Sequence, residues 1–131
     1  MKNKPSVLVV EESRGAGESL RQILKDEYNV HVAANLADAE QLLESHCTDA
    51  IMLEPWLRGL QGQPLLDRLR AKASAVPVII VSGYPLGRWF NGDVREQIFA
   101  YFPKPFDILE FKAAVRKCVG LHAQAGEFVY R

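Results

Sequence analysis

The stretch Pro77-Val78-Ile79-Ile80-Val81-Ser82-Gly83 decides the fold class of this chain. Its four central residues are apolar and β-branched, and a hydroxyl and a glycine follow them directly. A short, continuous apolar run of this kind is typical of a strand that is covered on both faces, as in parallel sheets. The segment therefore predicts a buried central strand whose polar end lies at one edge of a sheet.

Four further apolar runs lie at similar intervals along the chain, and amphipathic helical patterns separate them. In these patterns apolar side chains recur three and four residues apart, as Leu65, Leu66 and Leu69 do. The alternation predicts an α/β fold with parallel strands and helices on both faces of the sheet. The predicted strands are Ser6–Val10, Asn29–Ala33, Ala50–Leu53, Val76–Val81 and Ile98–Phe102, and the predicted helices are Ser13–Asp26, Asn35–Ser45, Gln63–Lys72, a weaker one within Leu86–Phe99, and Asp107–Val119.

Length and composition are those of a single globular domain. The chain has 131 residues, of which 48% are hydrophobic and 24% are charged. We expect one domain over residues 1–131, with a core of about 5–120 and a tail, 121–131, that extends the last helix or frays. Sixteen basic residues balance sixteen acidic ones, so direct binding of nucleic acid is not expected.

Targeting signals and paired cysteines are not apparent in the sequence. The apolar run Val7–Val10 is too short for a signal segment, and no apolar stretch reaches the length of a membrane span. Cys47 and Cys118 are isolated from each other. These features favour reduced cysteines, a cytoplasmic location and no membrane association.

Polar side chains follow four of the predicted strands. They are Glu11-Glu12, Glu54, Ser82-Gly83 and Lys104-Pro105. Because parallel strands end at the same edge of a sheet, we expect these residues to converge. Three carboxylates and one ammonium leave an excess of about two negative charges, which a cation, protonation or water must relieve. Hard oxygen ligands of this kind suit Mg²⁺ or Ca²⁺.

These residues and their spacing resemble the receiver domain of two-component response regulators. The matching segments are Val7–Ser13, Asp49–Glu54, Pro77–Tyr84 and Tyr101–Phe106, and the resemblance covers about residues 5–120. It implies a flavodoxin-like (βα)5 fold, a doubly wound parallel sheet of five strands in the order 2-1-3-4-5. It also implies a signalling module that has no enzymatic activity of its own and belongs to a phosphorelay.

The resemblance also implies a role for each polar residue. In the family, an aspartate ending the third strand receives a phosphoryl group from a histidine kinase. An acidic pair and that aspartate hold Mg²⁺, and a Ser/Thr and a Lys bind the phosphoryl oxygens. The corresponding residues are Glu11 and Glu12 for the acidic pair, Glu54 for the acceptor, Ser82 and Lys104 for the phosphoryl oxygens, Trp56 and Gly83 for backbone contacts, Tyr101 for the switch and Pro105 for a cis-proline.

The acceptor position departs from the family pattern because it holds Glu54 instead of aspartate. The additional methylene moves the carboxylate outward by about 1.5 Å. In-line phosphoryl transfer needs finer positioning than that, so we expect no efficient phosphorylation of Glu54. Two roles remain open for this side chain. It either fills the vacated site, or it reaches toward Lys104 and Ser82 and partly imitates a phosphorylated aspartate.

The acidic pair departs as well, because both of its members are glutamates where the family more often has an aspartate. Glu11, Glu12 and Glu54 could still ligate a cation, but with looser geometry. Mg²⁺ requires near-octahedral ligation. We therefore expect Mg²⁺ binding to be weak or lost, and we expect no other cofactor.

The resemblance places partner contacts on the fourth helix, fifth strand and fifth helix. This face would include Arg88, Trp89, Phe90, Tyr101 and Lys112, and its partner would be a histidine kinase, an output domain or a second copy in a homodimer. Trp56 and Tyr84, each two residues beyond a site residue, are expected to roof the pocket.

The alternative reading is a flavodoxin-like domain that binds a small ligand or nucleotide. It depends on Gly15-Ala16-Gly17. That segment lacks the third glycine of the dinucleotide fingerprint, and Glu11 and Glu12 would repel a pyrophosphate.

Overall fold

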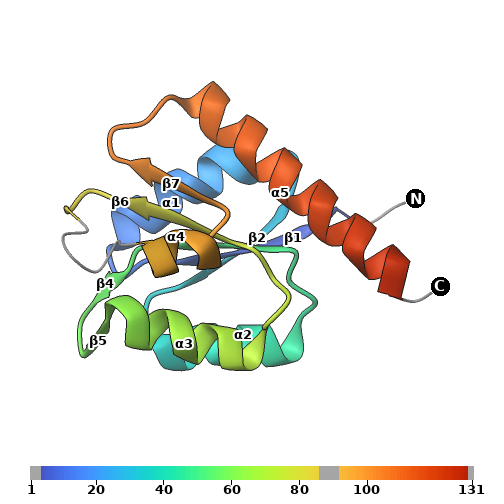
Figure 1. The fold of residues 1–131 in the computed structure, drawn as a ribbon. Helices are drawn as coiled ribbons and strands as arrows, with labels where there is room; N and C mark the ends of the chain where they lie inside the picture. Colours follow the sequence, from blue (N-terminus) through green and yellow to red (C-terminus); the bar gives the residue numbers. More distant parts are fainter. Residues whose placement is uncertain (1–3, 86–91, 130–131) are drawn as a thin grey trace.

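The computed structural model describes residues 4–85 and 92–129, which form a central sheet with helices on both faces (Figure 1). Five parallel strands pair in the order β2-β1-β3-β6-β7. This is the predicted order 2-1-3-4-5, so the predicted fold class is confirmed. The sheet strands are β1 (Ser6–Val10), β2 (Asn29–Ala33), β3 (Ala50–Leu53), β6 (Val78–Ser82) and β7 (Ala100–Pro103), and the helices are α1 (Arg14–Leu24), α2 (Leu36–Ser45), α3 (Gly62–Lys72), α4 (Gly92–Gln97) and α5 (Ile108–Val129).

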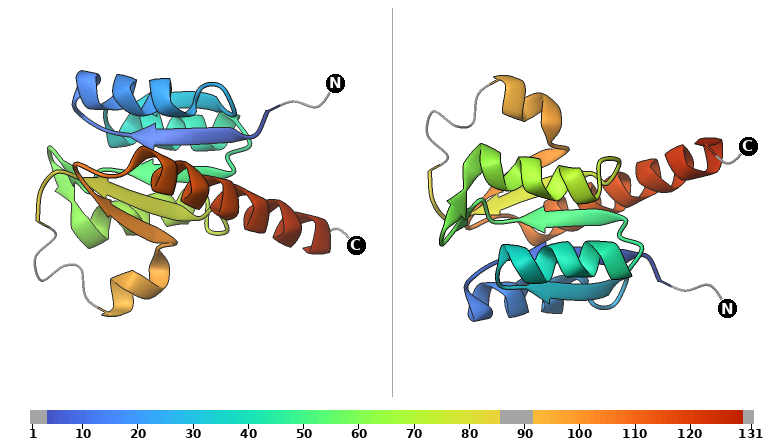
Figure 2. Two further views of the ribbon diagram at one scale, coloured as in Figure 1. Left: turned by 90° about the horizontal axis from the view of Figure 1, so that it is seen from above. Right: turned by 90° about the horizontal axis from the view of Figure 1, so that it is seen from below.

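The core is divided between the two faces of the sheet. On one face α1 and α5 cover Val7, Val9 and Met52, and Phe111 from α5 is fully buried there. On the other face α2 and α3 cover Leu8, Ile51 and their neighbours. Figure 2 shows these two layers from above and below. Strands β1, β3 and β6 are buried on both faces, as their continuous apolar sequences predict.

The first three predicted strands agree with the structure, whereas the last two begin two residues later than predicted. Pro77 explains the later start of β6, because proline has no backbone N–H for the ladder. Its carbonyl still accepts a hydrogen bond from the Ile51 N–H at 2.9 Å. Val76 instead packs into the core as a buried loop residue.

Local hydrogen bonds define the helix starts. The side chain of Ser13 accepts from the Ala16 N–H, that of Asn35 from the Asp38 N–H, and that of Asp107 from the Glu110 N–H. Helix α4 falls within the predicted region Leu86–Phe99, of which residues 86–91 lie outside the described part. Helix α5 continues to Val129, so most of the expected tail is helical.

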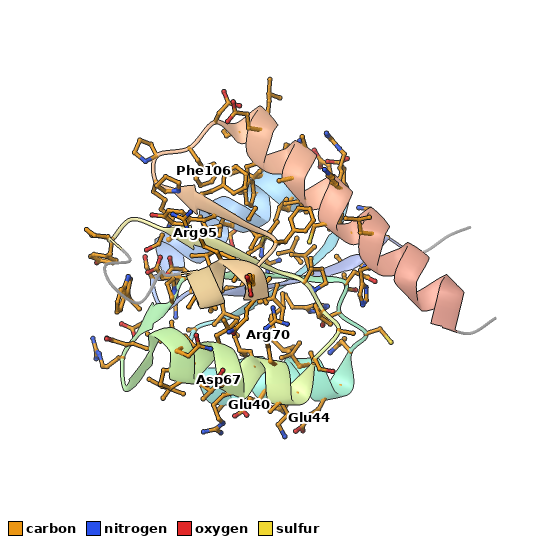
Figure 3. The ribbon with its side chains drawn as sticks, in the orientation of Figure 1. Glu40, Glu44, Asp67, Arg70, Arg95 and Phe106 are labelled. Atoms are coloured by element: carbon orange, nitrogen blue, oxygen red, sulfur yellow. The ribbon has the colours of Figure 1, made fainter. Side chains whose placement is uncertain are left out.

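Side chains tie neighbouring elements together on each face. Arg68 and Lys72 of α3 pair with Glu40 and Glu44 of α2, whose labelled carboxylates lie on the outer side of these helices (Figure 3). On the opposite face Phe106 lies between the end of β7 and α5 (Figure 3), with its ring centroid 4.8 Å from that of Phe111.

A short hairpin between β3 and α3 was not predicted. Strands β4 (Trp56–Leu57) and β5 (Leu60–Gln61) pair antiparallel. Gly59 in the turn has a φ of 91°, a left-handed conformation that glycine adopts at little cost. The hairpin positions the segment that follows Glu54.

The remaining sequence predictions concern membranes and cysteines. In the described part of the chain, no helix combines the length and apolar character needed to cross a membrane. Cys47 is exposed and Cys118 is buried, and both are free thiols.

Candidate functional site

Most of the polar strand ends line one pocket of about 420 Å³ at the carboxyl edge of the sheet, although Ser82 itself is not among the lining residues. The ladder explains this convergence, because Val10 lies opposite Leu53, and Leu53 lies opposite Ile80. Two of its lining residues, Ser13 and Ala16, were not predicted, although both lie just beyond the acidic pair at the start of α1. The lining residues are Glu11, Glu12, Ser13, Ala16, Glu54, Trp56, Gly83, Tyr84 and Lys104.

Glu54 is held deep in this pocket, and only 5% of its surface is exposed. Its Oε1 accepts a hydrogen bond from the Ser82 hydroxyl at 3.0 Å. Burial raises the pKa of Glu54, and the nearby charge of Glu11 raises it further. The bonds from Ser82 and Trp56 and the charge of Lys104 act in the opposite direction.

Ser82 is also fully engaged. Its Oγ accepts from the Tyr84 N–H at 3.1 Å and lies 3.0 Å from Glu54 and 3.2 Å from the Tyr84 carbonyl. A hydroxyl has a single proton to donate. The Glu54 carboxylate is the stronger acceptor of the two when it is charged. The Ser82 side chain is therefore committed to Glu54 within the pocket.

Lys104 contacts the acidic pair. Its Nζ lies 3.2 Å from Oε1 of Glu11, whose other oxygen accepts from the Ser13 N–H at 3.0 Å. Glu11 is buried, and the side chain of Lys104 is 28% exposed. If Glu54 imitated a phosphorylated aspartate, its carboxylate would reach both Lys104 and Ser82. In the structure the hydrogen bond of Glu54 is to Ser82. The Lys104–Pro105 peptide bond is cis, the isomer that the resemblance implied.

Glu12 points to the hairpin. Its Oε1 accepts from the backbone N–H of Arg58 at 2.8 Å, and its Oε2 lies 3.8 Å from the Arg58 guanidinium. Sequence reasoning missed Arg58 because the hairpin that presents it was not predicted.

Each of the three carboxylates thus has a different partner. Among the residues that the structure describes, no three acidic, histidine or cysteine side chains are grouped so that they could hold a metal ion. Glu11, Glu12 and Glu54 therefore do not form such a group in this arrangement.

The pocket walls include Trp56 and Tyr84, the two residues expected to roof it. Tyr84 is 65% exposed, whereas Trp56 is half-buried against the core. Gly83 lies beside Lys104, and a Cβ on this glycine would be 3.8 Å from the lysine Cδ.

Tyr101 lies outside the pocket on β7, half-buried against the α2–α3 side of the core. With Arg95, Ile98, Phe99 and Ala100 it lines a separate shallow groove. The predicted contact residues Arg88, Trp89 and Phe90 lie outside the described residues.

Of the two glycines that suggested a nucleotide site, Gly17 has a packing role and Gly15 has none. A Cβ on Gly17 would lie 2.9 Å from Cγ1 of Val32, so α1 approaches β2 too closely for a side chain there. Gly15 has open space around it. The requirement at Gly17 therefore needs no bound phosphate to explain it.

Comparison with known proteins gives the family. A model of the response regulator receiver domain matches residues 7–116. A putative NtrX-like response regulator of Rickettsia bellii is 31% identical over 104 residues, which are 77% of this chain and 22% of that relative. The chain thus spans less than a quarter of the length of that relative.

Two solved structures show the same fold. The signal receiver domain of an HD domain-containing protein from Pseudomonas fluorescens Pf-5 has a TM-score of 0.84 and 26% identity, covering 93% of this chain and 99% of that one. TrrA from Thermotoga maritima, solved in complex with Mg²⁺-BeF, has a TM-score of 0.74 and 23% identity, covering 87% and 98%. From its sequence match and its fold, the chain belongs to the response regulator receiver domain family.

Proposed function

We propose that this chain is a receiver module of a two-component system that acts through protein contacts and is not regulated by phosphorylation at position 54. The observation that carries the proposal is the 3.0 Å hydrogen bond between Ser82 and Glu54. In the family this hydroxyl binds a phosphoryl oxygen. Here the side chain at the acceptor position occupies it instead.

The chemistry of phosphoryl transfer supports this reading. The acceptor oxygen must face the incoming phosphorus in line with the leaving group. Glu54 is longer than aspartate by about 1.5 Å, and its carboxylate is buried and bonded to Ser82. An attack by this carboxylate would require that bond to break and the side chain to withdraw.

Filling of the site agrees better with the contacts than full imitation does. A phosphorylated aspartate would present nearly two negative charges to both Ser82 and Lys104. Glu54 supplies one charge, and Lys104 is paired with Glu11 at 3.2 Å. Glu54 therefore holds Ser82 in place without drawing the lysine away from the acidic pair.

The proposed function does not depend on Mg²⁺. TrrA was solved with this ion, but here Glu11, Glu12 and Glu54 are directed to three different partners. Binding of Mg²⁺ would therefore be weak at most.

Signalling would pass through the face formed by α4, β7 and α5. The groove of Arg95, Ile98, Phe99, Ala100 and Tyr101 lies there and combines apolar side chains with a cation. Its partner would be a histidine kinase, an output domain or a second copy of the chain. The module would act in the cytoplasm, with no catalytic activity and no direct contact with nucleic acid.

Intact-mass measurement after incubation with acetyl phosphate tests the proposal. A receiver domain with aspartate at the acceptor position serves as the control for the reagent. We expect the control to gain a phosphoryl group and this chain to remain unmodified. A stoichiometric acyl phosphate on Glu54 of the unaltered chain would overturn the proposal.

A further inference from the structure

We infer that Glu12 is a latch that holds the β4–β5 hairpin against the β1–α1 loop, so that the acidic pair is bound by the chain's own groups instead of by a divalent metal ion. The inference goes beyond the proposed function, since it concerns the acidic pair and holds whether or not Glu54 accepts a phosphoryl group.

The contact between Glu12 and the hairpin is specific. Glu12 directly follows the end of β1, and Arg58 occupies the turn between β4 and β5. The Arg58 N–H donates to Oε1 of Glu12 at 2.8 Å across 46 residues of sequence. The guanidinium is 90% exposed and lies 3.8 Å from Oε2, so solvent weakens that ion pair. The backbone hydrogen bond is therefore the main part of the latch.

The hairpin carries groups that the pocket needs. Trp56 lies on β4 and lines the pocket, and its backbone N–H lowers the pKa of Glu54. Leu57 anchors the same strand in the core, and the Gly62 N–H bonds to the Pro55 carbonyl at 2.9 Å at the base of the hairpin. By holding the turn, Glu12 helps to position the segment that contacts Glu54.

The latch and a metal ion compete for the same carboxylates. A divalent ion at the acidic pair would take carboxylate oxygens of Glu11 or Glu12. Glu11 is already bonded to the Ser13 N–H and paired with Lys104, and Glu12 is bonded to Arg58. A metal ion would therefore compete with Lys104 for Glu11 and with Arg58 for Glu12. The ammonium of Lys104 thus supplies the positive charge that a metal ion would otherwise bring to Glu11.

The turn geometry permits a substitution that removes the backbone donor together with the guanidinium. Gly59 has the positive φ that a type II turn requires at its third position, and proline is common at the preceding position of such turns. Arg58→Pro removes the N–H from the latch, whereas Arg58→Ala removes only the guanidinium. Glu12→Gln keeps an acceptor oxygen, whereas Glu12→Ala removes it.

Amide hydrogen exchange by NMR on the full chain measures the latch. We expect the Arg58 amide to exchange at least tenfold faster in Glu12→Ala than in the wild type, while Glu12→Gln and Arg58→Ala stay within threefold of it. The Trp56 amide should be deprotected in both Glu12→Ala and Arg58→Pro. Unchanged Arg58 exchange in Glu12→Ala, or unchanged Trp56 exchange in Arg58→Pro, would overturn the inference.

A titration with MgCl₂ tests whether the chain's own groups take the place of a divalent ion at the acidic pair. We expect the amide resonances of Arg58, Trp56 and Ser82 to be unaffected by millimolar Mg²⁺ in the wild-type chain. A saturable shift of these resonances would overturn it. Phosphorylation of Glu54 without any effect of Mg²⁺ on the hairpin would instead defeat the proposed function and leave the latch standing.

Discussion

Lys104 pairs with Glu11 across 93 residues of sequence, with Nζ 3.2 Å from Oε1, and Glu54 bonds to Ser82 instead. The carboxylates of Glu11 and Glu54 thus have different partners, although both lie near the ammonium of Lys104. Lys104 is partly exposed in this ion pair, whereas the Ser82 hydroxyl that bonds to Glu54 is buried. This division of partners leads to the first two predictions.

Ser82→Ala should destabilise the fold by about 1–3 kcal/mol at pH 7, because it leaves a buried carboxylate without one of its donors. Urea unfolding measures the change. Ser19→Ala is the matched control, since the Ser19 hydroxyl bonds to a carbonyl within an exposed part of α1. An equal loss of free energy in the two variants would contradict this role of Ser82.

Glu54→Gln should remove a pH dependence of stability. The pKa of Glu54 is raised in the folded state, mainly by burial, so between pH 4.5 and this raised pKa the Glu54 side chain is more protonated in the folded than in the unfolded chain. Its contribution to the free energy of unfolding therefore falls as the pH rises from 4.5 through the folded pKa, and is constant above it. The glutamine variant should gain stability relative to wild type over this window.

Urea unfolding of both proteins at a series of pH values isolates this effect as a difference curve. The hydrogen bond with Arg116 lowers the pKa of Glu27, so the contribution of Glu27 to stability has the opposite pH dependence. Glu27 is present in both proteins, and its contribution therefore cancels in the difference curve. A difference curve that is flat, or that falls with pH, would show that burial of Glu54 carries no cost.

Gly17→Ala should destabilise the fold by about 1–3 kcal/mol, because the added methyl would lie 2.9 Å from Cγ1 of Val32. Valine is stiff about χ1 and cannot easily move aside. Gly15→Ala in the same helix meets open space and should stabilise by up to about 1 kcal/mol. Thermal unfolding of both variants checks the opposite signs. A loss of stability in both would point to helix α1 as a whole.

The two thiols should react at very different rates. Cys118 is fully buried, and burial raises its pKa to about 12, whereas Cys47 is exposed. A colorimetric disulfide reagent at pH 8 should modify one thiol quickly and the other only after denaturation. Cys47→Ser should abolish the fast phase. Persistence of that phase in the variant would mean that the interior near α5 opens readily.

Much of the architecture follows from local patterns in the sequence. The continuous apolar runs of β1, β3 and β6 indicate strands buried on both faces, and the polar residues after them identify the edge where a site forms. The β4–β5 hairpin has only two residues in each strand, too few to produce an alternating pattern. The residues after 120 suit either a helix or a frayed end, and the structure shows that α5 continues to Val129.

The sequence by itself determined which polar groups end the strands and gather at the carboxyl edge of the sheet, because apolar runs identify the parallel strands. The strand order and the acceptor position that Glu54 occupies were implied by the resemblance to receiver domains. Only the tertiary structure decided the partner of each carboxylate. Glu11 pairs with Lys104, Glu12 accepts a hydrogen bond from the Arg58 N–H, and Glu54 accepts one from the Ser82 hydroxyl. The physical reason is the short range of these contacts. A hydrogen bond needs a donor–acceptor distance of about 3 Å. Whether two groups tens of residues apart in sequence come that close depends on how whole helices and strands pack.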